Sequence, residues 1–369
     1  QIPSLAGLVR HAKETKDLRR TAAHAIGASR DAEALTTLES LYKASLPEDV
    51  KRGIVHAVAD NENRQAAYAF LLRVAQSDPD GELPRAAVHQ LADPGRAAAV
   101  EDLFKIYASD RDMDVRRAVI HALAEIEDPR AQAKINEIAR NANEHEDLRR
   151  QAIHQIAERD TEAAFDELTA IFEADRAEDV RRQILHAFSE MQTPRARARL
   201  LSAARDPREQ DDVRRQAIHW LAEQQTEASL DELIKIFDAD RNTEVRRQIL
   251  HALSEMKMRR AEDKLFEVAS RGTDEELRRS AIHMLGEMAT DRSLQLLGET
   301  VNRSDEQTEV QVQAVRAISE KPPEQAVPML LNIARTHQNP EVRKEAIRRL
   351  GESDDPRAVE YFREILTKK

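Results

Sequence analysis

The chain has 369 residues, of which 41% are hydrophobic, 34% charged and 4% aromatic, with nine glycines and no cysteine. This composition indicates a folded, strongly helical protein, argues against sheet-rich and disordered classes, and excludes disulfides, thiolate metal sites and a cysteine nucleophile. The formal charge of −11 argues against a general nucleic-acid-binding or anionic-membrane-binding surface. Since no apolar run reaches the roughly 18 residues of a membrane span, we expect no direct membrane insertion and a soluble protein of the cytoplasm or periplasm.

One motif recurs along the chain, with clear copies such as DVRRAVIHAL at 114, DVRRQAIHWL at 212 and EVRRQILHAL at 244. The apolar residue after the acid of each copy is here called the anchor. Eleven anchors follow one another in steps of 32 or 33 residues: Leu18, Val50, Leu83, Val115, Leu148, Val180, Val213, Val245, Leu277, Val310 and Val342. Four aromatic residues, Tyr42, Tyr107, Phe172 and Phe237, lie 65 residues apart, which indicates an ancestral unit of two repeats.

Each repeat contains two helical patterns. In residues 226–239 the residues Leu230, Leu233, Ile234 and Phe237 form one apolar helix face, which predicts a helix A. A second stripe over 243–256 predicts a helix B. Predicted N-caps precede B helices at Asp80, Asp112, Asn242, Asp274 and Asn339, and A helices at Asp128, Thr193 and Asp355 before proline.

The two ends of the chain differ. A first helix A is expected near 3–14, and its apolar residues Ile2, Leu5, Leu8 and Val9 leave one side uncovered. The chain also opens without methionine, so we expect a trimmed chain with further residues before Gln1. A lone polar helix near 356–367 is expected to cap the other end. Because the connections are short, helix pairs must stack, which predicts an all-α, right-handed α-solenoid of about eleven two-helix repeats, a single domain over 1–369.

The motif resembles the HEAT-repeat family, especially the short bacterial units called PBS-lyase HEAT-like repeats. Helix B of that family starts with valine and arginine and has a small-residue-leucine core, which Val245-Arg246 and Ala252-Leu253 match. The resemblance covers essentially the whole chain and implies that the B helices line a concave wall. The family includes scaffolds, enzymes and nucleic-acid binders, so function must be argued from the surface.

Nine repeats carry a histidine six residues after the anchor, here called the histidine ladder: His24, His56, His89, His121, His154, His186, His219, His251 and His283. The last two repeats carry Arg316 and Arg348 there. At 100° per residue this position lies at about 240°, opposite the buried face centred near 40°, so the ladder is predicted to face outward. Protonating all nine would change the formal charge from −11 to −2, so we expect partner binding to depend on pH between about 7 and 5.

Arginine two residues after the anchor and an acid ten residues after it flank each histidine on the same ridge. The predicted partner-binding surface comprises Arg117, His121, Glu125, Arg150, His154, Glu158, Arg182, His186, Glu190, Arg215, His219, Glu223, Arg247, His251 and Glu255, and Asp93 belongs to the same acidic row. Such rows suit an extended peptide or helix of complementary charge. The alternatives are a structural zipper between repeats and a plain solvated face carrying i, i+4 pairs.

Two further positions have structural expectations. The residue directly after the anchor, here called the spine position, lies at the edge of the buried face. Its arginines, such as Arg181, Arg214 and Arg246, are predicted to tie the loops to Asp175 and Asp240. The single tryptophan, Trp220, lies at about 340° on its helix and is predicted to be buried in the core.

The function we expect is a non-enzymatic bacterial scaffold for a protein or peptide, with no catalytic residue, no metal, no cofactor and no nucleic acid. One alternative is a metal-binding or catalytic protein, of the bilin-lyase or deoxyhypusine hydroxylase kind. The hydroxylase has His-Glu pairs where this chain has Arg182-Gln183 and its equivalents, and the single such pair, His145-Glu146, is expected in a loop. A DNA-binding protein of the HEAT-like glycosylase kind is the other alternative, which the negative charge disfavours. The partner, compartment and oligomeric state stay open.

Overall fold

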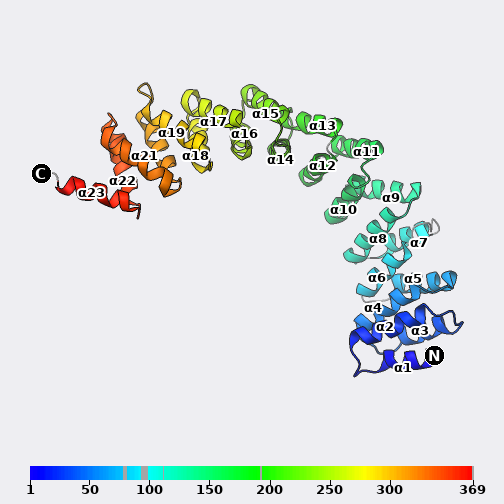
Figure 1. Cartoon of the computed structure of the whole chain (residues 1–369). Helices are drawn as coiled ribbons and strands as arrows, with labels where there is room; N and C mark the ends of the chain where they lie inside the picture. Colours follow the sequence, from blue (N-terminus) through cyan, green and yellow to red (C-terminus); the bar gives the residue numbers. More distant parts are fainter. Residues whose placement is uncertain (78–80, 93–98, 111, 192, 368–369) are drawn as a thin grey trace. The chain divides into compact units, whose positions relative to one another are not determined.

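The structure is a computed structural model that describes residues 1–77, 81–92, 99–110, 112–191 and 193–367. Over these residues the chain forms 23 α-helices and no strand (Figure 1). The predicted all-α class is therefore confirmed, and the regular succession of helix pairs makes the fold an α-solenoid. Asp80 and Asp93, which the sequence assigns to a cap and to the acidic row, lie outside the described residues. Among the described helices none combines the length and apolarity needed to cross a bilayer.

The helices group into two compact units, Gln1–Ala187 and Phe188–Lys369. The first contains α1 (Ile2–Arg10), α2 (Lys16–Gly27), α3 (Ala34–Tyr42), α4 (Glu48–Ala59), α5 (Arg64–Ser77), α6 (Glu82–Leu91), α7 (Ala99–Ser109), α8 (Met113–Glu125), α9 (Pro129–Arg140), α10 (Glu146–Ala157), α11 (Glu162–Ala174) and most of α12 (Glu178–Met191). The second contains α13 (Pro194–Arg205), α14 (Asp211–Glu223), α15 (Glu227–Ala239), α16 (Thr243–Glu255), α17 (Arg259–Arg271), α18 (Glu275–Glu287), α19 (Asp291–Asn302), α20 (Thr308–Ser319), α21 (Pro323–Thr336), α22 (Pro340–Gly351) and α23 (Pro356–Thr367). A single domain over 1–369 stays a prediction.

Within each unit the helices form two layers (Figure 1). The even-numbered helices are the B helices, and successive B helices pack on one another from α2 to α10 and from α14 to α22. Each of these also packs on the A helix of its own repeat. The apolar stripe of α16 shows why: Val245, Ile249 and Leu253 are fully buried between these neighbours. Each helix pair thus buries its apolar face against the next pair, as expected for a solenoid.

The first helix is shorter than its predicted range of 3–14. It ends at Arg10, and His11 has extended backbone torsions as its C-cap. The reason lies in the following residues, because the Thr15 hydroxyl accepts a hydrogen bond from the Leu18 amide and starts α2. The connection therefore takes the residues that the apolar pattern alone assigned to the helix.

The predicted helix starts agree with the structure where it describes them. Asp112 Oδ1 accepts from the amides of Asp114 and Val115 at 2.8 and 3.3 Å, and Asn242 caps α16 in the same way. Thr193 caps α13 ahead of its first-turn proline. Each such cap stabilises its helix by about 1 kcal/mol, so the helix boundaries follow from local side-chain chemistry.

Buried arginines at the spine position connect the repeats. Arg214 is 2% exposed, and its Nε and Nη2 donate to the Ala204 carbonyl at 3.1 and 3.0 Å. Its Nη2 also pairs with Asp240 of the next repeat. Ala204 lies in the last turn of an A helix, where carbonyl groups lack helical partners. One guanidinium thus caps a helix and joins two repeats.

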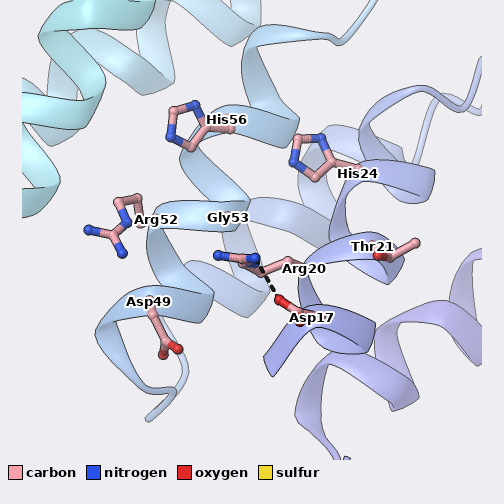
Figure 2. A pocket seen from close by; sticks show the side chains of 8 residues that line it. All are labelled: Asp17, Arg20, Thr21, His24, Asp49, Arg52, Gly53 and His56. Atoms are coloured by element: carbon pink, nitrogen blue, oxygen red, sulfur yellow. Dashed lines mark hydrogen bonds and ion pairs between the residues drawn. The ribbon is translucent and has the colours of Figure 1, made fainter. Parts of the chain in front are cut away.

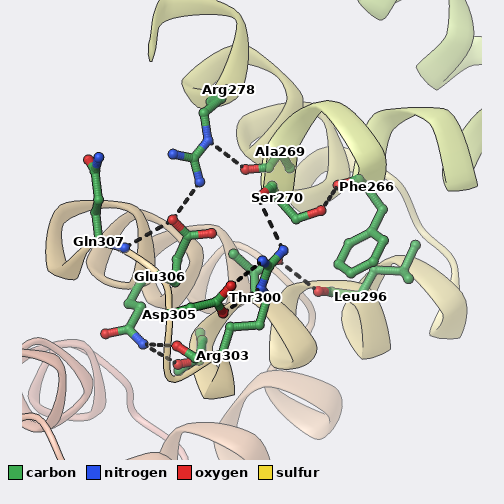
Figure 3. A network of polar contacts seen from close by, with 12 residues as sticks. Phe266, Ala269, Ser270, Arg278, Leu296, Thr300, Arg303, Asp305, Glu306 and Gln307 are labelled. Carbon is green, nitrogen blue, oxygen red and sulfur yellow. Dashed lines mark hydrogen bonds and ion pairs between the residues drawn. The ribbon is translucent and has the colours of Figure 1, made fainter. Parts of the chain in front are cut away.

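The same arrangement recurs with other partners. Arg278 donates to the Ala269 carbonyl at 2.9 Å and to Glu306 of the next repeat at 2.6 Å (Figure 3). Arg149 donates to the Ala139 carbonyl and pairs with Asp175. The prediction that spine arginines tie the loops to Asp175 and Asp240 is therefore confirmed for Asp240 with Arg214 and for Asp175 with Arg149.

In the intervening repeats an aromatic ring contacts the cation at the spine position. The spine cation lies over the aromatic residue nine positions earlier in four repeats: Lys51 over Tyr42 at 5.4 Å, Arg116 over Tyr107 at 4.3 Å, Arg181 over Phe172 at 3.7 Å and Arg246 over Phe237 at 4.4 Å from the ring centroid. Cation–π contacts of this kind stabilise partly desolvated cations. The aromatic period of 65 residues therefore reflects two alternating ways of holding the spine cation.

We predict that Arg214→Met lowers the free energy of unfolding by about 3 to 5 kcal/mol, because it leaves Asp240 and the Ala204 carbonyl without their buried partner. The matched control is Arg215→Met, which removes the neighbouring surface ion pair with Asp212 and should cost less than about 1 kcal/mol. Urea unfolding of the full chain, followed by the emission of Trp220, measures both. Equal losses in the two variants would contradict the role given to the spine position.

Candidate functional site

The histidine ladder lies on the exposed side of the B helices. Its nine members belong to the even-numbered helices α2 to α18, and each is exposed or half-buried. The side chain of His121, for example, is 48% exposed. The predicted outward orientation is thus confirmed. Fourteen of the fifteen predicted surface residues lie on α8, α10, α12, α14 and α16, and the fifteenth, Glu158, is the C-cap of α10. We call the positions two, six and ten residues after each anchor, which are exposed or half-buried in these helices, the B-helix face.

The ladder histidines lie beside the acidic row. His154 Nε2 is 3.3 Å from Oε1 of Glu158, the C-cap of α10, and His283 pairs with Glu287 at 3.5 Å on α18. Some contacts also join neighbouring repeats, as between His24 and Asp60 at 3.4 Å. Both members of each pair are largely exposed, so each contributes no more than about 1 kcal/mol.

The arginines two residues after the anchors pair with a second set of acids, distinct from the acidic row, which the sequence analysis missed. Arg117 Nη1 lies 2.6 Å from Asp114 on the same helix, and Arg247 Nη1 lies 2.9 Å from Glu276 of the next repeat. The signal was present, because every repeat has an acid directly before its anchor: Asp17, Asp49, Glu82, Asp114, Asp147, Asp179, Asp212, Glu244, Glu276, Glu309 and Glu341. A repeat with arginine, neutral histidine and two acids presents a net negative charge.

The first two B helices show how these groups meet. A pocket of about 430 Å³ between α2 and α4 is lined by Asp17, Arg20, Thr21, His24, Asp49, Arg52, Gly53 and His56 (Figure 2). Arg20 pairs with Asp17 at 2.6 Å. A Cβ at position 53 would lie 2.8 Å from Cγ of Arg20, so Gly53 leaves room for that side chain between the helices. The lining is mostly polar and suits a charged group better than an apolar one.

Trp220 is half-buried, which contradicts its predicted place in the core. Its ring centroid is 5.0 Å from that of His219, and it lines a pocket of about 740 Å³. Six other repeats have an alanine at this position, such as the buried Ala122 and Ala252, and two have the longer buried side chains Gln155 and Met284. The indole is larger than any of these side chains, and it lies at the pocket wall.

Three potential metal ligands come together in the second unit. His219 and Glu223 lie one turn apart on α14, and Glu255 comes from α16. One ligand atom from each lies within 4.8 Å of the others. Imidazole and carboxylate ligands in this number suit zinc and related divalent ions. His219 is half-buried and both glutamates are exposed.

Two ladder imidazoles hold a proton less readily than usual. Burial lowers the pKa of His89 below its ordinary value of 6.5, and His121, whose ring centroid is 5.7 Å away, and Arg85 lower it further. Burial likewise lowers the pKa of His56, with His24 and Arg52 adding to the effect. In both cases the neighbouring acid opposes the shift without reversing it.

A lowered histidine pKa in the folded protein means that the unfolded chain binds the proton more tightly. Stability should therefore fall as the pH drops through about 6.5. We predict that His89→Gln reduces the fall in melting temperature between about pH 7.5 and 5. The control is His251→Gln at the same ladder position, where the side chain is 51% exposed beside Glu255. Differential scanning calorimetry measures the melting temperatures, and an unchanged pH dependence in His89→Gln would be the contrary result.

No curated protein matches the chain. Among solved structures, human deoxyhypusine hydroxylase in complex with glycerol is 16% identical, with a TM-score of 0.30 over 68% of this chain and 94% of the hydroxylase. Importin beta is 11% identical, with a TM-score of 0.42 over 95% of this chain and 59% of that chain. Kap121p bound to Nup53p is 12% identical, with a TM-score of 0.42 over 98% and 46%.

The chain spans about half the length of importin beta and Kap121p, and these likenesses concern the fold alone. The sequence comparison is more specific. A family model for HEAT repeats matches residues 68–147, 137–222, 208–286, 230–307 and 301–369, which together extend over 68–369. This is more than half of the chain, and the matched segments follow the helix pairs described above. The protein therefore belongs to the HEAT-repeat family.

Proposed function

We propose that this protein is a non-enzymatic scaffold that binds a protein or peptide along the B-helix face. The observation that supports this proposal most is that each repeat separates buried packing positions from exposed polar positions. The anchor and spine positions are buried and carry the packing, as Val213 and Arg214 do. The ladder position two turns further contributes an exposed or half-buried imidazole in nine successive repeats.

The chemistry of the face suits an extended partner. Each repeat offers the same few polar groups, and each contact with an exposed group is weak. A partner that follows several repeats adds these contacts within one complex, so affinity can build up without any deep site. Solenoids present long surfaces of this kind, and a continuous strand or helix is the ligand that matches them.

The finer assignments belong to the same proposal. The valine-arginine start and the small-residue-leucine core of helix B, as in Val245-Arg246 and Ala252-Leu253, support a bacterial repeat of the PBS-lyase type. We place the protein in the cytoplasm or periplasm. The formal charge of −11 and the acids paired with the arginine row support a protein or peptide partner over a nucleic acid.

A photo-crosslinking amino acid tests which face binds. Placed at His154 on the B-helix face, it should yield a crosslink of defined mass in cells of the source organism, and Glu158→Lys should reduce that yield several-fold, because it reverses a charge on the face. The control position is Lys134 on α9, an A helix. Crosslinks that form from Lys134 and not from His154 would contradict the proposal.

Metal binding is a second candidate function, supported by the convergence of His219, Glu223 and Glu255. It predicts about one zinc per chain in protein purified without nickel resin and dialysed against metal-free buffer. His219→Ala should lose that zinc, because it removes the nitrogen ligand. His154→Ala, at an equivalent ladder position, should retain it. Mass-spectrometric metal analysis decides the matter, since metal-free wild-type protein would rule this candidate out.

A further inference from the structure

Trp220 departs from the repeat pattern. It lies seven residues after its anchor, where six other repeats have alanine: Ala25, Ala57, Ala122, Ala187, Ala252 and Ala317. Repeat duplication copies every position, so copying accounts for the ladder but does not account for an aromatic residue that occurs once. A large, half-buried apolar side chain at such a place is typical of a binding surface.

The surroundings of Trp220 form a cavity of suitable size for an apolar group. The cavity of about 740 Å³ lies between the end of α12, the start of α13 and the end of α14. Phe188 is buried against it and Leu201 is half-buried, while Ala198 is exposed. Volumes of roughly 300 to 1,000 Å³ with aromatic and aliphatic walls are typical of ligand sites.

Two residues of the acidic row lie at the same cavity. Glu190 and Glu223 both line it, and both are exposed. The cation in the lining, Arg197, donates from Nη2 to the Ser229 hydroxyl at 3.2 Å. The cavity thus combines an apolar wall with two carboxylates at the protein surface, and the whole chain carries a charge of −11. A basic ligand is attracted to such a site and an acidic one is repelled.

A second cavity of similar construction lies two repeats further along. It has about 910 Å³ and lies between the ends of α16 and α18 and the start of α17. Met256, Met258 and Met288 contribute apolar side chains, and Glu255 and Glu287 of the acidic row line it. Methionine side chains adapt to varied apolar ligands. Lys257, Arg259 and Arg292 line this second cavity as well and offset its carboxylates, so the Trp220 cavity suits a basic ligand better.

We propose that the cavity beside Trp220, here called the Trp220 pocket, holds an apolar side chain of a lysine- or arginine-rich segment of the partner. This inference rests on the proposed scaffold function and names the chemistry of its ligand. The apolar side chain packs against Trp220 and Phe188. Its basic neighbours lie along the carboxylates of Glu190 and Glu223.

Three synthetic peptides test the pocket on the full chain: Lys-Lys-Gly-Leu-Gly-Lys-Lys, the same peptide with serine in place of leucine, and the leucine peptide with glutamate in place of lysine. Trp220 is the only tryptophan, so its emission reports on the pocket directly. The basic leucine peptide should shift that emission to shorter wavelength and bind about tenfold more tightly than the serine peptide. The acidic peptide should bind more weakly than either.

Two matched variants separate the pocket from the rest of the face. Ala198→Phe fills the pocket and should abolish the preference for leucine, as measured by anisotropy of dye-labelled peptides. Ala133→Phe, at the corresponding exposed position of α9, should retain it. Circular dichroism checks that both variants are folded.

Equal affinity of the two basic peptides, no binding of the leucine peptide, or an undiminished leucine preference in Ala198→Phe would overturn the pocket proposal. None of these results would affect the scaffold function, which depends on the crosslinks from His154. Conversely, crosslinks confined to the A helices would remove the scaffold function and leave the peptide result as a separate property of the Trp220 pocket.

Discussion

The fold depends on a buried or half-buried cation that follows the anchor of most repeats. A guanidinium can be buried only if its donors are satisfied, and the end of an A helix supplies carbonyl groups that need a donor. Arg214 joins these two requirements and uses its remaining donor on Asp240 of the next repeat. Where the arginine is replaced by Gln311, the amide still donates to the Val301 and Arg303 carbonyls at 2.9 and 2.8 Å. The donor can therefore be kept without the charge, and in one repeat Pro84 replaces both.

The hydrogen bonds of the spine side chain lie at the buried edge of helix B. The residues on the opposite side of the helix therefore do not have to serve the packing of the repeats. Neighbouring acids offset the arginine row there, as Asp114 does for Arg117. The acidic row contributes further negative charge, and several of its members lie beside imidazoles, as Glu158 does beside His154. The B-helix face is thus acidic when the histidines are neutral, which favours a basic partner and makes its attraction sensitive to protonation.

Repeated and unrepeated residues carry different information. The histidine ladder occurs in nine copies, and duplication alone could account for its regularity. Trp220 occurs once, at a position where six of the other ten repeats have alanine, and a cavity lies beside it. Stacking does not require an indole at this position, because six repeats have an alanine there. The glutamates at both cavities connect this exception to the regular acidic row.

The sequence alone determined the helix pairs, the cap at Asp112 and the outward direction of the histidines, because each depends on residues within a few positions along one helix. It also located the loop acid Asp240 as a partner of the spine arginines. The pairing of Arg117 with Asp114 was accessible from their spacing and was overlooked. Only the tertiary structure decided where Trp220 lies and that His219, Glu223 and Glu255 converge, since both depend on the distance between neighbouring helices. That distance is set by side chains far apart in the chain, and helical periodicity within one repeat contains no information about it.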